Sequence, residues 1–344
     1  MKLSSSFNCN GHVRGSGENR ISLVLATGTV QTTKAVVVVE LTVKAAVRDV
    51  LQPKVRNGWL LARVKAVAIN PTDWKHVAWA AADVRCRVGC DYAGVVEEVG
   101  ANVTNFQPGD RITGWIHGSN RANHEYGAFA ELAIAKACVQ MKVPDNMSFE
   151  EAPSLGVAHM TVLAKLSGLT VITTSSTRNF DLVKSLGADA AFDYNSPTCG
   201  KDIKRFTNNK LLYSWDCTGD GAGICAAAMS DAEPGTYGTI MPADYELLAR
   251  TNPKVTGQEF MCGYDTQGEF YYWLGDVPVQ PDPTEMEFYR MFLELTQRLL
   301  ESGAIKPPRM SLNKMGGGLE GVAKGLAEMQ AGLVLSAEKL VYTI

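Results

Sequence analysis

A change of pattern after Pro144 constrains the fold of this chain more than any other feature. Before it, short β-branched apolar segments are separated by turn residues, and after it strand-like and helix-like segments alternate. The alternating part contains, in order, LTVITTSS, NFDLVKSLGA, AAFDY, KDIKRFT and LLYSWDCT. Such alternation is typical of a doubly wound parallel sheet. The sequence therefore predicts an α/β chain in which two different architectures are joined.

The part before Pro144 predicts a small β-barrel. Its candidate strands cover residues 34–40, 59–69, 92–100 and 127–135. Segment 105–116 places a Pro-Gly-Asp turn, at 108–110, before a further strand. Short strands at this spacing, with turn residues between them, favour a barrel over a layered α/β sheet.

The remaining segments complete a layout of four parts. Residues 1–33 are rich in Ser, Asn, Gly and Thr, and we expect a disordered N-terminal extension there. We expect the barrel domain over 34–157, a nucleotide-binding domain over 158–305, and a return to the barrel domain over 306–344. Helices are predicted at 285–305 and 318–332, and the last seven residues are predicted to form a strand.

Composition narrows the possible functions. The chain has 33 Lys and Arg against 36 Asp and Glu and shows no basic patch, which argues against a nucleic-acid partner. Its 8 Cys are scattered without a CxxC pair, a pattern that suits reduced thiols in the cytoplasm. No apolar run approaches the roughly 18 residues of a membrane helix. We expect a soluble cytoplasmic protein that binds neither nucleic acid nor a membrane.

Several motifs carry a resemblance to a known superfamily. They are NPTDWK (70–75), GCDYAGVVEEVG (89–100), PGDRITG (108–114) and GAFAEL (127–132). Together they resemble the medium-chain dehydrogenase/reductase superfamily, and more narrowly its zinc-free quinone and enoyl reductases. Segments 178–194 and 317–342 are similar to the trans-acting enoyl reductases that partner fungal reducing polyketide synthases. The resemblance implies a GroES-like β-barrel domain with an inserted Rossmann-type domain.

The resemblance also implies the reaction. Hydride passes from NADPH to the β-carbon of an α,β-unsaturated thioester on a polyketide synthase carrier domain, and a proton reaches the α-carbon, in secondary-metabolite biosynthesis. Preorganised donors must then stabilise the enolate oxygen. The family places the Lys of NPTDWK beside the nicotinamide, which makes Lys75 the candidate catalytic donor; a solvated surface Lys is the alternative. Thr72, Asp73 and Trp74 would shape the same cofactor wall.

The same alignment of motifs bears on zinc. The zinc alcohol dehydrogenases of this superfamily use a Cys and a His at positions that hold Asn70 and Cys90 here, and their four-cysteine lobe is absent. Cys86, Cys90 and Asp91 could in principle bind a metal. Cysteines near a strand are more often small core residues, so we predict no metal site.

The end of the strand at 169–176 predicts the cofactor. NAD enzymes usually place an acid there for the ribose 2′-hydroxyl, and this chain has none before Asp181. The hydroxyls, cation and amide found instead suit the 2′-phosphate of NADP, although a plain turn with a helix N-cap is the alternative. These residues are Ser175, Ser176, Thr177, Arg178 and Asn179. By resemblance, Tyr194 would flank the adenine, and Leu335 and Ser336 would be the last cofactor contacts.

One expected part of a dinucleotide site is missing. A Rossmann unit opens with a strand, a glycine-rich loop and a helix whose N–H groups hold the phosphates. Here GVAHMTV passes straight to LAKLSG, so we expect the first strand, its loop and most of the first helix, about 30 residues, to be absent. The glycines at 219–223 also follow a strand, but they stand fourth in strand order and are expected to be a decoy. A splice or gene-model variant would explain the gap.

Three functions therefore stay open. The first is the trans-acting enoyl reductase, the second a zinc-free quinone or alkenal reductase with a diffusible substrate, and the third a catalytically inactive variant that only docks on the synthase. Gly263, Tyr264 and Phe270 favour the first, because by resemblance they offer the small and aromatic walls of a substrate tunnel. A surface loop would look similar. The missing loop favours the third, and a trans-acting enzyme could well be monomeric.

Overall fold

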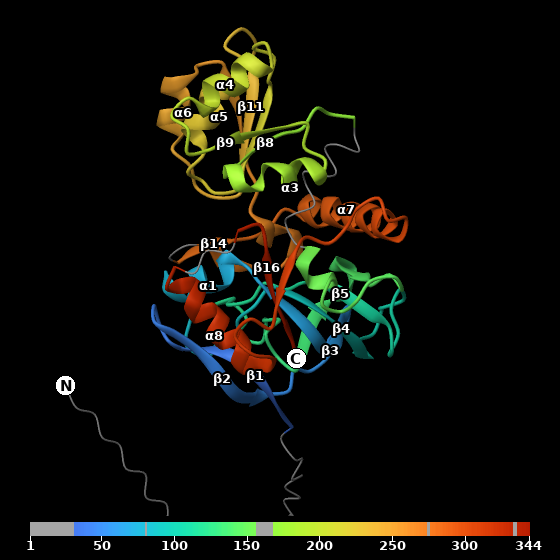
Figure 1. Cartoon of the computed structure of the whole chain (residues 1–344). Coiled ribbons are helices and arrows are strands. Elements are labelled where there is room, and N and C mark those ends of the chain that lie inside the picture. Colours follow the sequence, from blue (N-terminus) through green and yellow to red (C-terminus); the bar gives the residue numbers. More distant parts are fainter. Residues whose placement is uncertain (1–30, 80, 156–167, 274–275, 333–335) are drawn as a thin grey trace, which may run out of the picture. The chain divides into compact units, whose positions relative to one another are not determined.

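The computed structural model describes residues 31–79, 81–155, 168–273, 276–332 and 336–344 (Figure 1). Among these residues, no helix is long and apolar enough to cross a membrane. Ser148 and Glu151 have the spacing of a capping box, which predicts the start of a helix. The box does form, since Glu151 N donates to Ser148 Oγ at 3.1 Å and Ser148 N donates to Glu151 Oε2 at 2.8 Å, and the 3₁₀ helix η2 (Ala152–Leu155) follows it. The rest of the predicted helix lies outside the described residues.

The barrel part is built from one hairpin and one seven-stranded sheet. The hairpin pairs β1 (Thr32–Glu40) with β2 (Lys44–Leu51), so the first strand begins two residues before the expected Lys34. The sheet runs in the order β15-β16-β3-β4-β5-β7, with β6 also paired to β3. Its strands are β3 (Trp59–Ile69), β4 (Asp91–Val99), β5 (Arg111–Trp115), β6 (Leu132–Lys136), β7 (Gln140–Lys142), β15 (Met310–Leu312) and β16 (Lys339–Thr343).

The predictions for two barrel segments have different outcomes. The predicted turn does precede a strand in segment 105–116, since Pro108 and Gly109 form a turn directly before β5. The expected strand at 127–135 begins only at Leu132. The last strand of the chain, β16, pairs antiparallel with β3, which confirms that the C-terminus returns to the barrel part.

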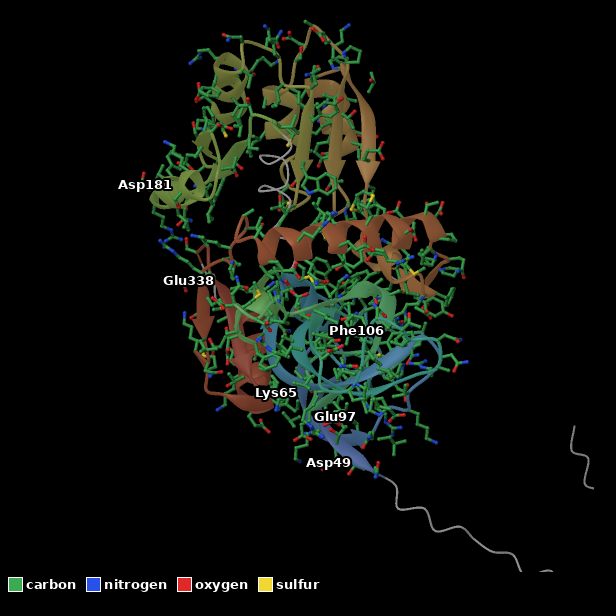
Figure 2. The ribbon with its side chains drawn as sticks, turned by 90° about the vertical axis from the view of Figure 1, so that its right-hand side faces the viewer. Asp49, Lys65, Glu97, Phe106, Asp181 and Glu338 are labelled. Carbon is green, nitrogen blue, oxygen red and sulfur yellow. The ribbon has the colours of Figure 1, made fainter. Side chains whose placement is uncertain are left out.

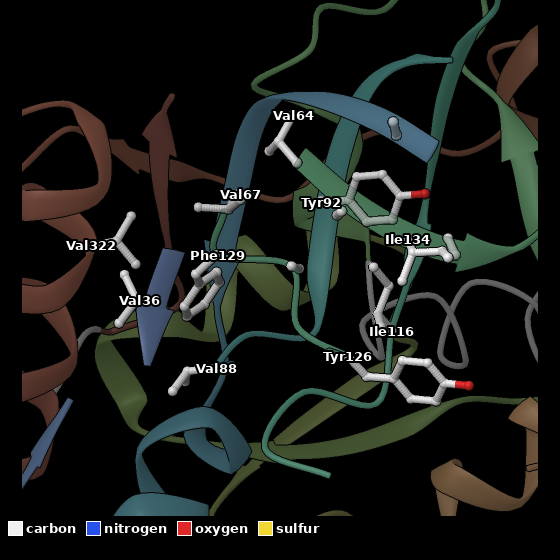
Figure 3. Packing of buried hydrophobic residues seen from close by; sticks show 14 of the residues in the cluster. Val36, Val64, Val67, Val88, Tyr92, Ile116, Tyr126, Phe129, Ile134 and Val322 are labelled. Atoms are coloured by element: carbon white, nitrogen blue, oxygen red, sulfur yellow. The ribbon is translucent and has the colours of Figure 1, made fainter. Parts of the chain in front are cut away.

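The barrel core is closed by residues from both ends of the chain. Figure 3 shows Val36 of β1, Val67 of β3, Tyr92 of β4 and Phe129 gathered with Val322, all of which are fully buried. Val322 lies on α8 (Gly318–Gln330), the helix predicted at 318–332. Burying side chains of this size contributes about 1.5–3 kcal/mol each. The C-terminal segment is therefore part of the barrel core.

The middle of the chain is a parallel α/β region, as predicted. Its strands are β8 (Ile172–Ser175), β9 (Ala190–Asp193), β10 (Tyr213–Asp216), β11 (Gly235–Thr239) and β12 (Val255–Phe260). Its helices are α3 (Phe180–Ser185), α4 (Cys199–Phe206), α5 (Ala222–Ala228) and α6 (Tyr245–Thr251). Every strand pair among them is parallel.

These five strands form two separate sheets. In the described part of the chain, β8 pairs only with β9, and β10, β11 and β12 form the other sheet. In the common doubly wound order 3-2-1-4-5-6, strand 1 lies between strands 2 and 4. If β8 and β9 are strands 2 and 3, the break falls where strand 1 belongs. Interior parallel strands are usually buried on both faces, yet Tyr213 on β10 is 74% exposed.

The segment after β12 leads back to the barrel. It contains the 3₁₀ helix η5 (Gly263–Gln267), the hairpin β13 (Tyr271–Trp273) and β14 (Val277–Val279), and helix α7 (Pro283–Glu301). Asp282 caps α7, since its carboxylate accepts Thr284 N–H at 2.8 Å. Leu293 and Leu300 of α7 pack with Val139 and Met141 of the barrel part. The predicted domain boundary at residue 305 places this helix in the nucleotide-binding domain, whereas its buried side chains pack in the core of the barrel part.

Candidate functional site

Helix α1 (Pro71–Ala78) carries the NPTDWK motif. It begins after Asn70, whose backbone is extended, and Pro71 occupies a first-turn position where its missing N–H costs nothing. Asp73 completes the start of the helix, since its Oδ2 accepts Asn70 N–H at 2.6 Å. Local sequence chemistry therefore fixes where α1 starts and which way its first turn faces.

A buried polar cluster anchors the start of α1 to the barrel. The Asn70 amide donates to Asp91 Oδ2 at 2.8 Å, and the Lys339 ammonium donates to Asn70 Oδ1 and, at 3.2 Å, to Asp91 Oδ2. This ammonium contacts Asn70, which occupies the position of a zinc ligand in the resembling alcohol dehydrogenases. Among the described residues, no group of three or more His, Cys, Asp and Glu is placed to hold a metal ion.

Asp73 lies beneath α1 with its carboxyl group inside the protein. The side chain is buried, and this burial raises its pKa to about 7 although the Asn70 N–H lowers it. Its Oδ1 has no hydrogen-bond partner, and the nearby Cys90 thiol has a raised pKa because it is buried beside two carboxyl groups. Sequence reasoning placed Asp73 on the cofactor wall, whereas the structure makes it a buried supporting residue.

Thr72 meets a cluster of aromatic side chains, which we call the Tyr264 cluster. The Thr72 and Tyr264 hydroxyls are 2.6 Å apart, and either can donate. The Tyr264 ring stacks on His117, with 3.8 Å between ring centroids and 14° between planes, and meets His76 edge-on at 5.4 Å. The cluster consists of Thr72, His76, Trp115, His117, Tyr264 and Tyr271. It joins the motif on α1 to the predicted substrate segment after β12.

Burial sets the charge state of this cluster. It lowers the pKa of both His76 and His117, and the two rings also lie 6.2 Å apart, so both imidazoles are neutral at pH 7. Burial raises the pKa of Tyr264 well above its ordinary value, so the phenol keeps its proton. The cluster therefore offers neutral proton donors and acceptors to whatever lies beside Thr72.

Lys75 lies one helical turn after Thr72 on α1, and its ammonium meets two tryptophan rings. Its ammonium is 5.1 Å from the ring centroid of Trp79 and 6.0 Å from that of Trp74. It makes no hydrogen bond or ion pair with any described residue. The exposed Trp79 ring stabilises a cation there by about 0.5–1 kcal/mol. Lys75 is thus a half-buried cation whose donors remain free for a ligand.

The predicted strand before Ser176 is present as β8, and no acidic residue follows it before Asp181. Residues 177–179 form a 3₁₀ turn, and Asp181 lies beyond it in α3, where Figure 2 labels it. Arg178 is exposed and has no ion pair with a described residue. Ser175 and Ser176 are half-buried beside it, and Thr177 is exposed. Among the described residues, the end of β8 therefore offers an unpaired guanidinium and three hydroxyl groups, which are donors suited to a phosphate group.

Two predicted cofactor positions from distant parts of the sequence come together here. The Asn179 amide donates to Ser336 Oγ at 2.9 Å and to Ser176 Oγ at 3.2 Å. Tyr194 follows β9 and is 50% exposed. Leu335 lies outside the described residues. The end of β8 and Ser336 therefore form one polar patch.

The glycine loop at 219–223 is filled by the protein itself. The Asp216 carboxylate accepts the N–H groups of Thr218 at 2.8 Å, Gly219 at 3.0 Å and Gly221 at 2.8 Å, and the Tyr237 hydroxyl at 2.9 Å. These bonds lower the pKa of Asp216. The loop donors already have an anion, which favours the expectation that this loop is a decoy.

The predicted substrate residues separate in space. Tyr264 joins Thr72, as described, whereas Phe270 is 39% exposed and packs edge-on against Tyr272. Gly263 is exposed, and a Cβ atom there would meet nothing within 4 Å. The sequence does not single out His76, His117 and Trp115 as site residues. Their sequence spacing carried no signal for an aromatic cluster.

The chain is similar to proteins of known family. Residues 56–145 match the model of the alcohol dehydrogenase GroES-like domain. The trans-enoyl reductase ACTTS2 of Alternaria alternata is 34% identical over 353 aligned positions, covering 91% of this chain and 99% of that protein. The trans-enoyl reductase TOXD of Cochliobolus carbonum is 38% identical over 287 positions, covering 72% and 94%.

Solved structures share the fold at low sequence identity. The CurK enoyl reductase superposes with a TM-score of 0.70 at 15% identity, covering 91% of this chain and 99% of that one. The mycobacterial Rv1454c, solved with NADPH, gives a TM-score of 0.68 at 19% identity, covering 91% and 100%. The predicted combination of a GroES-like domain and a Rossmann-type parallel domain is thus confirmed. Together with the identities above 30%, it shows that the chain belongs to the trans-enoyl reductase family of the medium-chain dehydrogenase/reductase superfamily.

Proposed function

We propose that this protein is an NADPH-dependent, trans-acting enoyl reductase. Its substrate would be the α,β-unsaturated thioester of an acyl chain on a polyketide synthase carrier domain. The observation that carries the proposal is the pairing of Thr72 with Tyr264 beside a free Lys75 on α1. This wall offers proton donors to an oxygen that gains negative charge, and the named relatives are trans-enoyl reductases.

The residues at the two ends of the cofactor site have distinct roles in this proposal. NADPH, when bound, would supply hydride to the substrate β-carbon. Arg178 and the hydroxyls of Ser175, Ser176 and Thr177 would hold its 2′-phosphate, and Asn179 would keep Ser336 in place beside them. The Lys75 ammonium would stabilise the negative charge on the thioester oxygen, a contribution typically worth about 3 kcal/mol at such sites.

The setting of the reaction follows from composition and family. The 8 scattered cysteines suit a reducing compartment, so we place the enzyme in the cytoplasm. The partner would be the carrier domain of a separate synthase, which a monomeric enzyme can reach as it diffuses.

Lys75→Met tests the proposed function. A 2-enoyl N-acetylcysteamine thioester is supplied with NADPH or NADH, and consumption of the cofactor is followed. The wild-type chain should reduce the thioester with NADPH preferred, and Lys75→Met should lower kcat about 100-fold. Lys65→Met, on strand β3 of the barrel part, serves as the charge control and should keep the wild-type rate. Faster turnover of a quinone or a free alkenal than of the thioester would instead identify a reductase with a diffusible substrate.

A second candidate rests on the broken sheet. The alignment with ACTTS2 has more positions than this chain has residues, so that relative contains segments that this chain lacks. The break between β8 and β10 lies where such a segment would supply the first strand and the phosphate loop. A chain without that loop would bind the synthase but not turn over, and a cofactor titration separates the two candidates.

A further inference from the structure

The Tyr264 cluster contains a hydrogen-bonded chain that ends at a phenol. The Tyr264 hydroxyl contacts Thr72 Oγ1 at 2.6 Å, and Thr72 Oγ1 lies 3.2 Å from His76 Nδ1. The same His76 nitrogen lies 2.9 Å from the Thr72 carbonyl oxygen. A carbonyl oxygen only accepts, so Nδ1 must carry the proton. The chain therefore runs from an imidazole N–H through a hydroxyl to the phenol.

The direction of this chain suits proton delivery to Tyr264. The imidazole N–H can donate to Thr72 Oγ1, and the Thr72 hydroxyl can donate to a phenolate oxygen. His76 is half-buried, and its other ring nitrogen makes no hydrogen bond with a described residue, which leaves this atom to recover a proton from water. The neutral state of His76, set by burial, leaves that second nitrogen able to accept.

The phenol is held in one orientation. His117 stacks on its ring at 3.8 Å between centroids, and Trp115 and Tyr271 lie at 5.7 Å and 5.8 Å. Tyr264 is nevertheless only half-buried, so it retains accessible surface. A rigid group with an accessible edge is what proton transfer to a bound substrate requires, because misplacement by about 1 Å costs about 100-fold in rate.

Thr72 and Lys75 are three residues apart on α1, and residues at this spacing lie on the same side of a helix, about 5–6 Å apart at Cβ. A phenol bonded to Thr72 is thus within one helical turn of the proposed oxyanion donor. In an enolate thioester, the oxygen and the α-carbon are separated by a single carbon atom. Two donors at this separation can address the oxygen and the α-carbon of the same substrate.

We propose that Tyr264 is the proton donor to the substrate α-carbon, and that Thr72 and His76 resupply its proton. The inference rests on the proposed enoyl reduction. Once the β-carbon has received hydride, the enolate electron pair forms the new α-C–H bond and the thioester carbonyl is restored. The Tyr264 O–H bond breaks in the same step. The phenolate takes the Thr72 proton, Thr72 takes the Nδ1 proton of His76, and the imidazole regains a proton from water.

Tyr264→Phe tests the donor, with Tyr342→Phe as the matched control. Tyr342 lies outside the Tyr264 cluster, on β16 in the barrel core, and its buried hydroxyl has no hydrogen-bond partner among the described residues. With the N-acetylcysteamine thioester and NADPH in D₂O, Tyr264→Phe should lower kcat about 100-fold at unchanged KM. Deuterium should enter one face of the α-carbon in the wild-type chain and both faces in Tyr264→Phe. Tyr342→Phe should keep single-face labelling and stay within about threefold of the wild-type kcat.

Two Thr72 variants test the relay. Thr72→Ser retains the hydroxyl and should keep most of the activity, whereas Thr72→Val removes it and should flatten the dependence of kcat on pH that arises from His76. In the cofactor-free protein, nitrogen NMR of labelled histidine should find His76 protonated at Nδ1. An Nε2-protonated His76, or a Thr72→Val variant as active as Thr72→Ser, would disprove the relay.

The outcomes separate this inference from the proposed function. A folded Tyr264→Phe variant that keeps its kcat and labels a single face would show that another group donates the proton, while the enoyl reductase itself stands. A wild-type chain that leaves the thioester unreduced would overturn the proposed function, and the donor role would fall with it. Circular dichroism of each variant shows whether a loss of activity results only from unfolding.

Discussion

Asp73 shows how burial changes a single residue. The motif alone indicated a polar residue beside the cofactor, but the carboxyl group is buried and its pKa is raised to about 7. Between about pH 4 and pH 7 the unfolded chain releases this proton while the folded chain keeps it. The free energy of unfolding therefore falls as pH rises through this window, by on the order of 4 kcal/mol for such a shift.

Asp73→Asn should remove this pH dependence. An amide oxygen can still accept the Asn70 N–H, so the start of α1 is retained. Urea unfolding at pH 5 and pH 8 should show the wild-type chain losing stability at the higher pH relative to Asp73→Asn. The quantity to compare is the difference in free energy of unfolding between the two proteins at each pH. The pKa values of His76 and His117 are lowered, so these residues reduce the stability of both proteins as pH falls, and the difference cancels this effect. Parallel profiles for the two proteins would mean that Asp73 is ionised in the native state.

Asp216 illustrates a residue whose role no local pattern revealed. Its carboxylate accepts three backbone N–H groups and one phenol, so Asp216→Ala leaves several donors without a partner. We expect a loss of about 3 kcal/mol in the free energy of unfolding. Asp220→Ala, at an exposed position in the same loop, should change it by less than about 0.5 kcal/mol.

Because the pKa of Asp216 is lowered, its contribution is present above about pH 4 and is lost as pH falls through the folded-state pKa. The difference between wild-type and Asp216→Ala, measured by urea unfolding, should therefore shrink in acid. Equal effects of Asp216→Ala and Asp220→Ala would show that the loop does not depend on this carboxylate.

At the scale of elements, the start of α1 could be predicted from the sequence, but the contacts that hold α1 against the barrel part could not. Asn70 and Pro71 are ordinary helix-start residues, and they mark the boundary in the sequence. The attachment depends on Lys339, which is 248 residues away from Asp91 along the chain. No periodicity or spacing connects such positions, since only the pairing of β16 with β3 brings them together.

Lys339→Met should loosen α1. It would leave Asp91 buried without its cation, and breaking a buried pair in this way costs about 3–5 kcal/mol. Hydrogen exchange should show faster opening of the amides of residues 71–78. Lys314→Met, at an exposed position, serves as the control. Adding Asp91→Leu to Lys339→Met should restore part of the stability, and failure to do so would mean that the loss has another cause.

At the scale of the whole molecule, the described parallel strands form two sheets instead of one continuous sheet, and aromatic residues on β10 are exposed. If the phosphate loop is absent, as the sequence predicts, NADPH should bind only through the residues at the end of β8. Binding of NADPH is measured by the rise in melting temperature during a titration, with NADH as the control. A ligand at 100 times its Kd adds about 2.7 kcal/mol of stability.

Grafting supplies the complementary experiment. The strand, loop and helix of ACTTS2 would be inserted between Gly156 and Gly168 of the sequence. The graft should raise the melting temperature, shield Trp215 from a fluorescence quencher, and strengthen NADPH binding at least tenfold. A strong NADPH-selective shift in the ungrafted chain would show that other residues already hold the diphosphate. No shift in either protein would favour the docking variant.

The sequence by itself determined the local structure and the family of this protein. Apolar alternation, turn residues and helix starts act over a few neighbours, so strands such as β3 and the acid-free end of β8 could be recognised in it. Motifs of consecutive residues, such as NPTDWK, can be recognised in the same way. Only the tertiary structure decided which distant groups meet: Thr72 with Tyr264, Asn179 with Ser336, and Asp91 with Lys339. These contacts depend on strand pairing and core packing across more than 150 residues, and no local physical rule encodes them.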